Sequence, residues 1–332
     1  MHWSCLRMKR QLSAYLAWLL IASAANISWG QPPDGRPQER PRRAARIPEG
    51  VRVERDLPYV PDGHPRQRVD LYLPRRDAHT TASAPWPLVI WIHGGAWRGG
   101  DRFPCPIVYL TEHGYAVASI GYRLSSDAIF PAQIHDCKAA IRFLRANANR
   151  WGLDPQRFGA WGASAGGHLA ALVGTSGNHT ELEGDLGTTS ASSAVQAVCD
   201  YFGPVDLLQM GAQSGPDSRL DHDGPNSPES LLLGAPVQTV PDRARMANPI
   251  TYIDPADPPM LIVHGDADPL VPYQQSQMLH EALQQAGVES ALVIVPGGGH
   301  GPFNGQEHLN RAVKFFDSHL KPNSAPPPQQ PQ

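Results

Sequence analysis

Ser164 stands in the stretch WGASAGGH, and its neighbours fit the pattern G-x-S-x-G. A serine in this pattern can act as a nucleophile when it sits on a sharp turn between a strand and a helix. The flanking residues predict such a turn, because 157–161 reads as a short strand and a helix is expected from Ala165. In a turn that tight, a side chain at Gly162 or Gly166 would collide with neighbouring backbone. We therefore interpret Ser164 as a nucleophile; the alternative is a serine that only caps a helix.

A nucleophilic serine needs a base that an acid holds in place, and two later stretches offer them. In PGGGHGPF, His300 follows three glycines, which predicts a mobile loop from which it can reach the serine as general base. In HGDADPLVP, Asp268 lies in the loop after a strand and can orient the imidazole. Asp266 is the rival acid, although its place near the strand end suits a turn that bonds backbone amides. His264 and His168 are expected to have packing or supporting roles.

The stretch HGGAW supplies the fourth part of such a site, a group of donors for a developing negative charge. Consecutive glycines let backbone amides turn towards an oxyanion. We expect the amides of Gly94, Gly95 and Ala165 to form this oxyanion hole. His93 is expected to hold the glycine loop in shape and not to act as a base.

The elements that must position these residues alternate between strands and helices. Two edge strands are expected at VRVERDLPY and QRVDLYLP, and buried strands at PLVIWIHGG, YAVASIGYRL and PMLIVHGDAD. Further strands are expected at RFGAWG, AVQAVCDYFG and ALVIVPGG. Helices are expected at 131–150, from 165, at 272–286 and at 305–320. This order predicts an α/β fold with a mostly parallel central sheet and helices on both faces. Ligands of such sheets bind at the carboxyl ends of the strands, where the residues above are found.

An insertion between two strands is expected over the site, from about residue 207 to residue 250. It is rich in Gly, Pro, Ser and Asp, and its one apolar run is Leu231–Leu233. A lipase that acts on fat droplets needs a larger apolar lid, so the insertion predicts activity on short acyl esters. Aromatic residues near strand ends are expected to form the pocket walls, and these are Trp97, Tyr122, Tyr201 and Phe202.

Composition divides the 332 residues into four parts. Residues 1–30 are expected to be an export signal, because a basic start precedes an apolar run and small residues. Residues 31–48 and 322–332 are expected to be a disordered linker and tail, and 49–321 to be the catalytic domain. The formal net charge of −3 gives no reason to expect nucleic acid as a partner, and no membrane association is expected after signal cleavage.

Three cysteines lie in the expected domain, at positions 105, 137 and 199. In an oxidising compartment an odd number leaves one without an intramolecular partner. Cys137 falls on the apolar stripe of the helix expected at 131–150 and is expected to be a buried small hydrophobe. A Cys105–Cys137 disulfide stays open as an alternative. The cysteine spacing does not fit a metal site, so no metal is expected.

The motifs HGGAWRGGD, GYRLS, GASAGGHLAAL, HGDADPLVP and GGGHG occur here in the order found in the α/β-hydrolase superfamily. From about Val51 to Leu320 the chain resembles the esterases related to hormone-sensitive lipase and the bacterial acetyl-xylan and feruloyl esterases. The resemblance implies a serine esterase that works through an acyl-enzyme without a metal or organic cofactor. Its substrate would be a short-chain or aromatic carboxylic ester, such as acetyl or feruloyl groups on polysaccharide. The alternatives are an amidase like kynurenine formamidase, a peptidase, or a non-catalytic binding protein on the same fold.

Overall fold

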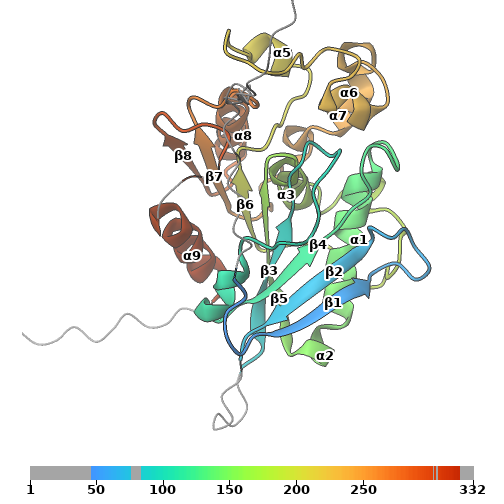
Figure 1. Cartoon of the computed structure of the whole chain (residues 1–332), viewed down its shortest axis with the longest axis vertical. Helices are drawn as coiled ribbons and strands as arrows, with labels where there is room; N and C mark the ends of the chain where they lie inside the picture. Colours follow the sequence, from blue (N-terminus) through green and yellow to red (C-terminus); the bar gives the residue numbers. More distant parts are fainter. Residues whose placement is uncertain (1–45, 76–83, 302, 304–305, 322–332) are drawn as a thin grey trace, which may run out of the picture. The chain divides into compact units, whose positions relative to one another are not determined.

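The computed structural model describes residues 46–75, 84–301, 303 and 306–321. Their central element is an eight-stranded sheet in the order β1-β2-β4-β3-β5-β6-β7-β8 (Figure 1). β1 and β2 pair antiparallel, as do β2 and β4, and every later pair is parallel. The strands are β1 Arg52–Pro58, β2 Arg68–Leu73, β3 Trp86–Ile92, β4 Ala116–Ile120, β5 Leu153–Ala163, β6 Ala197–Tyr201, β7 Met260–Gly265 and β8 Ser290–Val295.

Successive residues of β3 point into two different cores, because side chains alternate between the faces of a sheet. Leu88 and Ile90 join the core under α1, α3 and α8, whereas Val89 and Trp91 join the core under η1 and α9. The helices are η1 Val108–His113, α1 Ala132–Ala146, α2 Ala148–Trp151, α3 Ala165–Thr175, α4 Thr180–Glu183, α5 Met210–Gln213, α6 Pro228–Leu233, η2 Val237–Thr239, α7 Pro241–Met246, η3 Pro249–Tyr252, α8 Gln274–Gln285 and α9 Gln306–Leu320. The predicted α/β fold with a mostly parallel, doubly covered sheet is confirmed.

The prediction of two edge strands is correct for β1 and wrong for β2. β2 lies between β1 and β4, and its residues are buried on both faces. The alternation of apolar and polar residues in β2 predicts one solvent-exposed face, but Asp70 is only 2% exposed. Its carboxylate is bonded by Arg55 Nη1 at 3.2 Å and Arg102 Nε at 3.0 Å. Ion pairing therefore makes burial of this acidic residue tolerable.

The helix predicted at 131–150 is divided at Asn147 into α1 and α2. α1 buries charged residues as well as its apolar stripe, and each is paired. Asp136 accepts hydrogen bonds from the backbone and side chain of Arg123, which belongs to the GYRLS motif. Lys138 Nζ lies 3.1 Å from Glu183 Oε2. These pairs fix the loops that flank α1.

The three cysteines of the described chain are free and buried, so the Cys105–Cys137 disulfide is not formed. The predicted export signal, the tail and most of the linker lie outside the described residues. Within the described ranges, no helix combines the length and apolar character needed to cross a membrane.

Candidate active site

Ser164 occupies the turn between β5 and α3 with φ 57° and ψ −126°. A non-glycine residue with positive φ is strained by about 1–3 kcal/mol, and such strain is common at functional sites. The two flanking glycines have the steric reason expected of them. A Cβ atom on Gly162 would lie 1.9 Å from the carbonyl oxygen of Gly166, and one on Gly166 would lie 2.1 Å from that of Ile92. The turn therefore requires glycine at both positions.

The structure brings Ser164, His300 and Asp268 into one hydrogen-bonded line. His300 Nε2 lies 2.9 Å from Ser164 Oγ, and His300 Nδ1 lies 2.7 Å from Asp268 Oδ2. The loop after β8 carries His300, and the loop after β7 carries Asp268. With Nδ1–H donated to the carboxylate, Nε2 is left as the acceptor for the serine proton. This geometry is suited to nucleophilic attack by Ser164 with His300 as base.

Asp268 is prepared to stay ionised although its side chain is fully buried. Burial by itself would raise the pKa of this carboxyl group, but hydrogen bonds from His264 and His300 lower it well below its usual range. The backbone N–H groups of Leu270 and Val271 also donate to Oδ1, at 2.8 and 3.0 Å. The carboxylate can therefore balance a positive charge on His300.

Asp266 has a different position and a different partner. It is exposed, and its Oδ1 accepts a hydrogen bond from the backbone N–H of Gly297 at 2.6 Å. It thus joins the β7 loop to the glycine-rich loop that precedes His300. The sequence left Asp266 and Asp268 as alternative acids for the site. The structure shows that Asp268 is the one that contacts His300.

Of the two glycines expected in the oxyanion hole, Gly94 approaches Ser164 closely. A Cβ atom on Gly94 would lie 2.6 Å from the carbonyl oxygen of Ala163 and 3.3 Å from Ser164 Cβ. Gly95 has φ +115°, a conformation that favours glycine. Ala165 is the first residue of α3, so its N–H has no acceptor within its own helix. These three amides lie on the two segments that meet at the serine turn.

His93 supports this loop. Its Nδ1 donates to the carbonyl of Gly94 at 2.8 Å, and its ring stacks on Tyr122 at 4.3 Å between ring centres. The hydroxyl of Tyr122 in turn donates to the carbonyl of His93 at 2.9 Å. Burial lowers the pKa of His93 to about 4, so the ring is neutral near neutral pH and a weak base.

The four aromatic residues expected as pocket walls are all less than a tenth exposed. Tyr122 stacks on His93, and Trp97 packs edge-to-face against His168 at 5.2 Å. These two rings pack the interior behind the glycine loop, which corrects their predicted role as open walls. Tyr201 packs on Trp161 at 5.1 Å and is likewise an interior ring. Phe202 packs against the imidazole of His300 at 4.7 Å.

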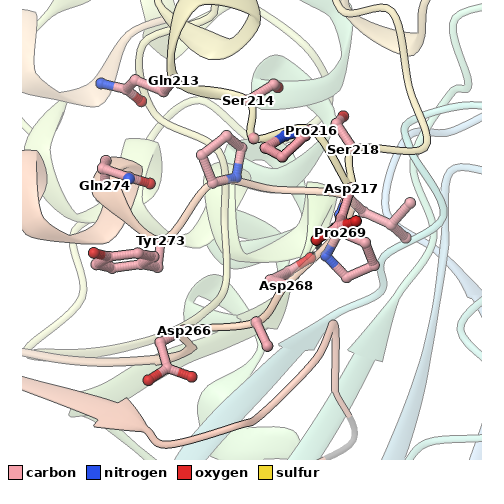
Figure 2. A pocket seen from close by; sticks show the side chains of 14 residues that line it. Gln213, Ser214, Pro216, Asp217, Ser218, Asp266, Asp268, Pro269, Tyr273 and Gln274 are labelled. Carbon is pink, nitrogen blue, oxygen red and sulfur yellow. Dashed lines mark hydrogen bonds between the residues drawn. The ribbon is translucent and has the colours of Figure 1, made fainter.

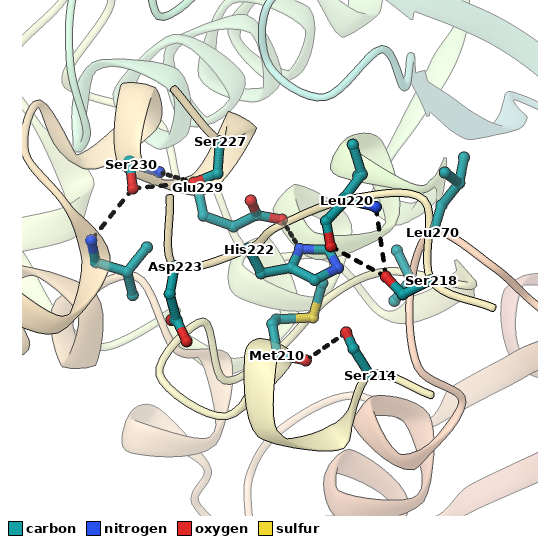
Figure 3. Close-up of polar contacts among 12 residues, drawn as sticks. Met210, Ser214, Ser218, Leu220, His222, Asp223, Ser227, Glu229, Ser230 and Leu270 are labelled. Carbon is teal, nitrogen blue, oxygen red and sulfur yellow. Dashed lines mark hydrogen bonds and ion pairs between the residues drawn. The ribbon is translucent and has the colours of Figure 1, made fainter. Parts of the chain in front are cut away.

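The insertion between β6 and β7 contains α5, α6, η2, α7 and η3, and Figure 1 shows α5, α6 and α7 gathered at one end of the sheet. Its apolar run is mostly inside, because Leu232 and Leu233 are buried. A buried pair also lies there: His222 Nδ1 is 2.9 Å from Glu229 Oε1, and both side chains are at most 4% exposed (Figure 3). The insertion is thus held by this polar pair and by apolar side chains that join the core under α1, α3 and α8.

A cavity of about 230 Å³ separates the insertion from the loop that carries Asp268 (Figure 2). Residues 213–218 form one side, and residues 266–270 and 272–274 form the other. Its lining includes the carboxylates of Asp217 and Asp266, the carboxamides of Gln213 and Gln274, and the phenol of Tyr273. The same lining holds apolar side chains, so the space next to Asp268 is of mixed character; these are Pro216, Ala267, Pro269, Leu270 and Pro272.

Two supporting residues escaped the sequence reasoning. Asp200 is fully buried at the end of β6, and burial raises its pKa to about 7. A lone acid inside the apolar stretch AVCDYF was the signal that could have found it. The buried amide of Gln275 accepts the N–H groups of Val205 and Asp206, each at 2.7 Å, and donates to Gln213 Oε1 at 2.6 Å. Nothing in the sequence of α8 around Gln275 indicates this role.

The sequence is also similar to a known family and to curated esterases. A family model described as BD-FAE matches residues 69–283, which is more than half of the chain. Esterase LipQ of Mycobacterium tuberculosis is 33% identical over 240 residues, and the match covers 70% of this chain and 53% of LipQ. The chain spans about half the length of the curated relatives it matches.

Solved structures resemble the fold over most of its length. A truncated carbohydrate esterase from gut microbiota superimposes with a TM-score of 0.72 and 35% identity, covering 80% of this chain and 95% of the other. A protein described as a bifunctional GH43-CE from Bacteroides eggerthii superimposes with a TM-score of 0.73 and 39% identity, covering 80% of this chain and 38% of the other.

Proposed function

The chain belongs to the BD-FAE family, and from this premise we propose that it is a serine esterase that hydrolyses carboxylic esters through an acyl-enzyme. The line Ser164–His300–Asp268, with separations of 2.9 and 2.7 Å, is the observation that carries the proposal. Hydrolytic enzymes of this kind are recognised by such geometry and not by the position of the residues in the chain.

The proposed reaction has two halves. Ser164 Oγ attacks the ester carbonyl while His300 Nε2 accepts its proton, and the amides of Gly94, Gly95 and Ala165 donate to the oxyanion. His300 then protonates the leaving alcohol, and the acyl group remains on the serine. Water attacks the acyl-enzyme with His300 again as base, which releases the acid and restores the serine. Asp268 balances the charge on the imidazolium in both halves.

The proposed substrates are short-chain or aromatic esters, including acetyl or feruloyl groups on polysaccharide. The likeness to a carbohydrate esterase at 35% identity supports a sugar ester as the alcohol part. The insertion supports a short acyl group, because Leu232 and Leu233 are turned inwards and leave no broad apolar lid.

Labelling of the intact protein with a fluorophosphonate probe tests the mechanism, because the reaction requires an activated serine. We expect covalent labelling of wild-type protein and none of Ser164→Ala. A panel of acetyl, feruloyl and longer acyl esters, with formanilide and a peptide amide alongside, tests the bond that is cleaved. Absence of labelling, or cleavage of the amides in preference to the esters, would contradict the proposal.

We also propose that the protein is exported, on the pattern of residues 1–30. The test is the N-terminus of the protein recovered from the periplasm or medium, which is expected to follow Ala24 or Gly30. Recovery of full-length protein in the cytosol alone would contradict export.

A further inference from the structure

We propose that Phe202 is a positioning residue for His300 and that its ring holds the glycine-rich loop after β8 against the serine turn. This inference rests on the proposed function, in which His300 is the general base. Phe202 directly follows β6, the strand between the one that leads to Ser164 and the one that leads to Asp268. It therefore lies where the separate parts of the site meet.

The backbone of Phe202 adopts a conformation that bulky residues avoid. Its φ is +45°, in the left-handed region that is ordinarily left to glycine and, less often, asparagine or aspartate. Its N–H donates to the carbonyl of Val263 at 2.8 Å, which continues the sheet into this turn. A strained backbone persists only where the surroundings fix it. The ring is thus directed to one side by contacts that outweigh the strain.

The neighbours of Phe202 supply those contacts. The carboxylate of Asp200, fully buried, accepts the N–H of Gly203 at 3.0 Å and so closes the turn around Phe202. On the other side of the turn, the carbonyl of Tyr201 accepts the N–H of Ser164 at 2.8 Å. The same short segment therefore holds the backbone of the nucleophile and carries the ring that meets the base.

The ring of Phe202 packs edge-to-face against His300, with 4.7 Å between the ring centres and 62° between the planes. Phe303 packs on the same ring at 5.4 Å. A Cβ atom on Gly301 would lie 2.5 Å from Phe202 Cζ, and Gly301 also has φ +33°, so both the ring and the backbone conformation favour glycine after His300. Gly301 and Phe303, which follow His300, thus accommodate this ring.

The loop that carries His300 is rich in glycine and restricts its own backbone little, which is why a positioning residue is needed. His300 is preceded by Gly297, Gly298 and Gly299, which have no side chains to restrict the backbone. The Asp268 contact restrains one ring nitrogen, and the Phe202 ring restrains the imidazole plane. Loss of the ring should therefore slow the chemical step and leave substrate binding almost unchanged.

The main test compares Phe202→Leu with Phe316→Leu, using nitrophenyl acetate as substrate. Phe316 is a matched control, because it is a fully buried aromatic residue of α9 that packs on Trp161. We expect Phe202→Leu to lower kcat about 10- to 100-fold, as small misplacements of reacting groups do, while KM changes less than about threefold. Phe316→Leu should lower the melting temperature by a similar amount and keep kcat within about twofold of wild type.

A double-mutant cycle with Gly301→Ala measures the contact directly. The added methyl group should lower kcat about tenfold or more beside the native ring. In the Phe202→Leu background the same change should cost at least about threefold less, because the collision with the ring is gone and only the strain of the positive φ at Gly301 remains. Additive effects in the two backgrounds would overturn the proposed contact.

A readout without substrate separates this inference from the proposed function. The His300 Nδ1 proton that is bonded to Asp268 gives a downfield NMR signal, which should broaden in Phe202→Leu and stay sharp in Phe316→Leu. An unchanged signal and unchanged kcat in folded Phe202→Leu would overturn the positioning role alone. Wild-type protein that cleaves no ester and takes up no fluorophosphonate would overturn the proposed function and the inference with it.

Discussion

His264 and His300 contact the same oxygen of Asp268, from 3.2 Å and 2.7 Å respectively. His264 Nε2 also lies 2.9 Å from the carbonyl of Val271, and its Nδ1 lies 2.7 Å from the hydroxyl of Ser276. Nε2 faces two acceptors and therefore carries a proton, so His264 is a donor to the carboxylate. His264 thus supports Asp268, and Asp268 in turn supports His300.

Removal of His264 should impair the ability of Asp268 to orient His300 but not abolish it. In His264→Phe, Asp268 loses a donor that lowers its pKa, so the carboxylate should orient His300 less well. We expect kcat for nitrophenyl acetate to fall about tenfold, because hydrogen bonds that support a reacting group typically affect rates on this scale. His280→Phe is the control, since that histidine of α8 bonds Ser290 away from the triad. Equal kcat in His264→Phe and wild type would exclude a supporting role.

Ser164→Ala should lower kcat by about a thousandfold or more, because the members of a triad act as a unit. The melting temperature should stay at or slightly above that of wild type, since the substitution retains the strained backbone and loses one hydroxyl. Ser318→Ala, on the exposed face of α9, serves as the control. The assignment of Ser164 fails if the alanine variant keeps activity near the wild-type level.

Asp268→Asn should cost far more activity than Asp266→Asn. The amide carries no negative charge to balance the imidazolium, and it can favour the wrong tautomer of His300 by donating to Nδ1; losses of about 10⁴-fold are known for such a change. Asp266 bonds the N–H of Gly297, which an asparagine oxygen can also accept, so a loss of less than about tenfold is expected. Kinetics of both variants, after circular dichroism has shown that each is folded, give the ranking. The reverse order would assign the acid to Asp266.

Stability should fall as the pH drops from about 6.5 to about 4. Burial lowers the pKa of His168 to about 4, so between these pH values an unfolded chain binds a proton that the folded chain does not. This favours unfolding by about 3 kcal/mol at the acidic end. His168→Gln can keep the hydrogen bond to the carbonyl of Ala247 and does not titrate. Its unfolding free energy should therefore depend less steeply on pH over this range; an equal slope would contradict the interpretation.

Glu229→Ala should loosen the insertion, because it leaves buried His222 without its acceptor. A buried polar group that loses its partner costs about 1–3 kcal/mol of stability. KM for polysaccharide-linked esters is expected to rise more than kcat falls, since the insertion flanks the site and carries no triad residue. Asp242→Ala, which removes an exposed acid of α7, should change neither quantity measurably. Unchanged stability of Glu229→Ala would show that the pair does not hold the insertion.

The fold and the core of the site could be predicted because their signals are local. Glycines flank Ser164 and His300, and polar residues follow the buried strands. In a parallel sheet these positions lie at the same edge, so the order of strands predicts that the residues meet there. The burial of Tyr122 and Trp97 could not be predicted in this way. Their rings become interior because His93 and His168 lie opposite them, and those contacts join segments far apart in the chain. The roles of Gln275 and Asp200 depend on tertiary contacts of the same kind.

The anchoring of the insertion by Gln275 has an evolutionary consequence. The chain leaves β6 through Val205 and Asp206, which this α8 residue holds, and it returns directly into β7. Changes confined to the loop 214–221 of the insertion, which contributes no buried residue, can accumulate without shifting the register of the parallel strands that deliver Ser164, Asp268 and His300. Selection can thus act on substrate recognition in one contiguous gene segment, while the reacting groups stay the same. Exchange of this segment between family members is accordingly the natural unit for recombination libraries.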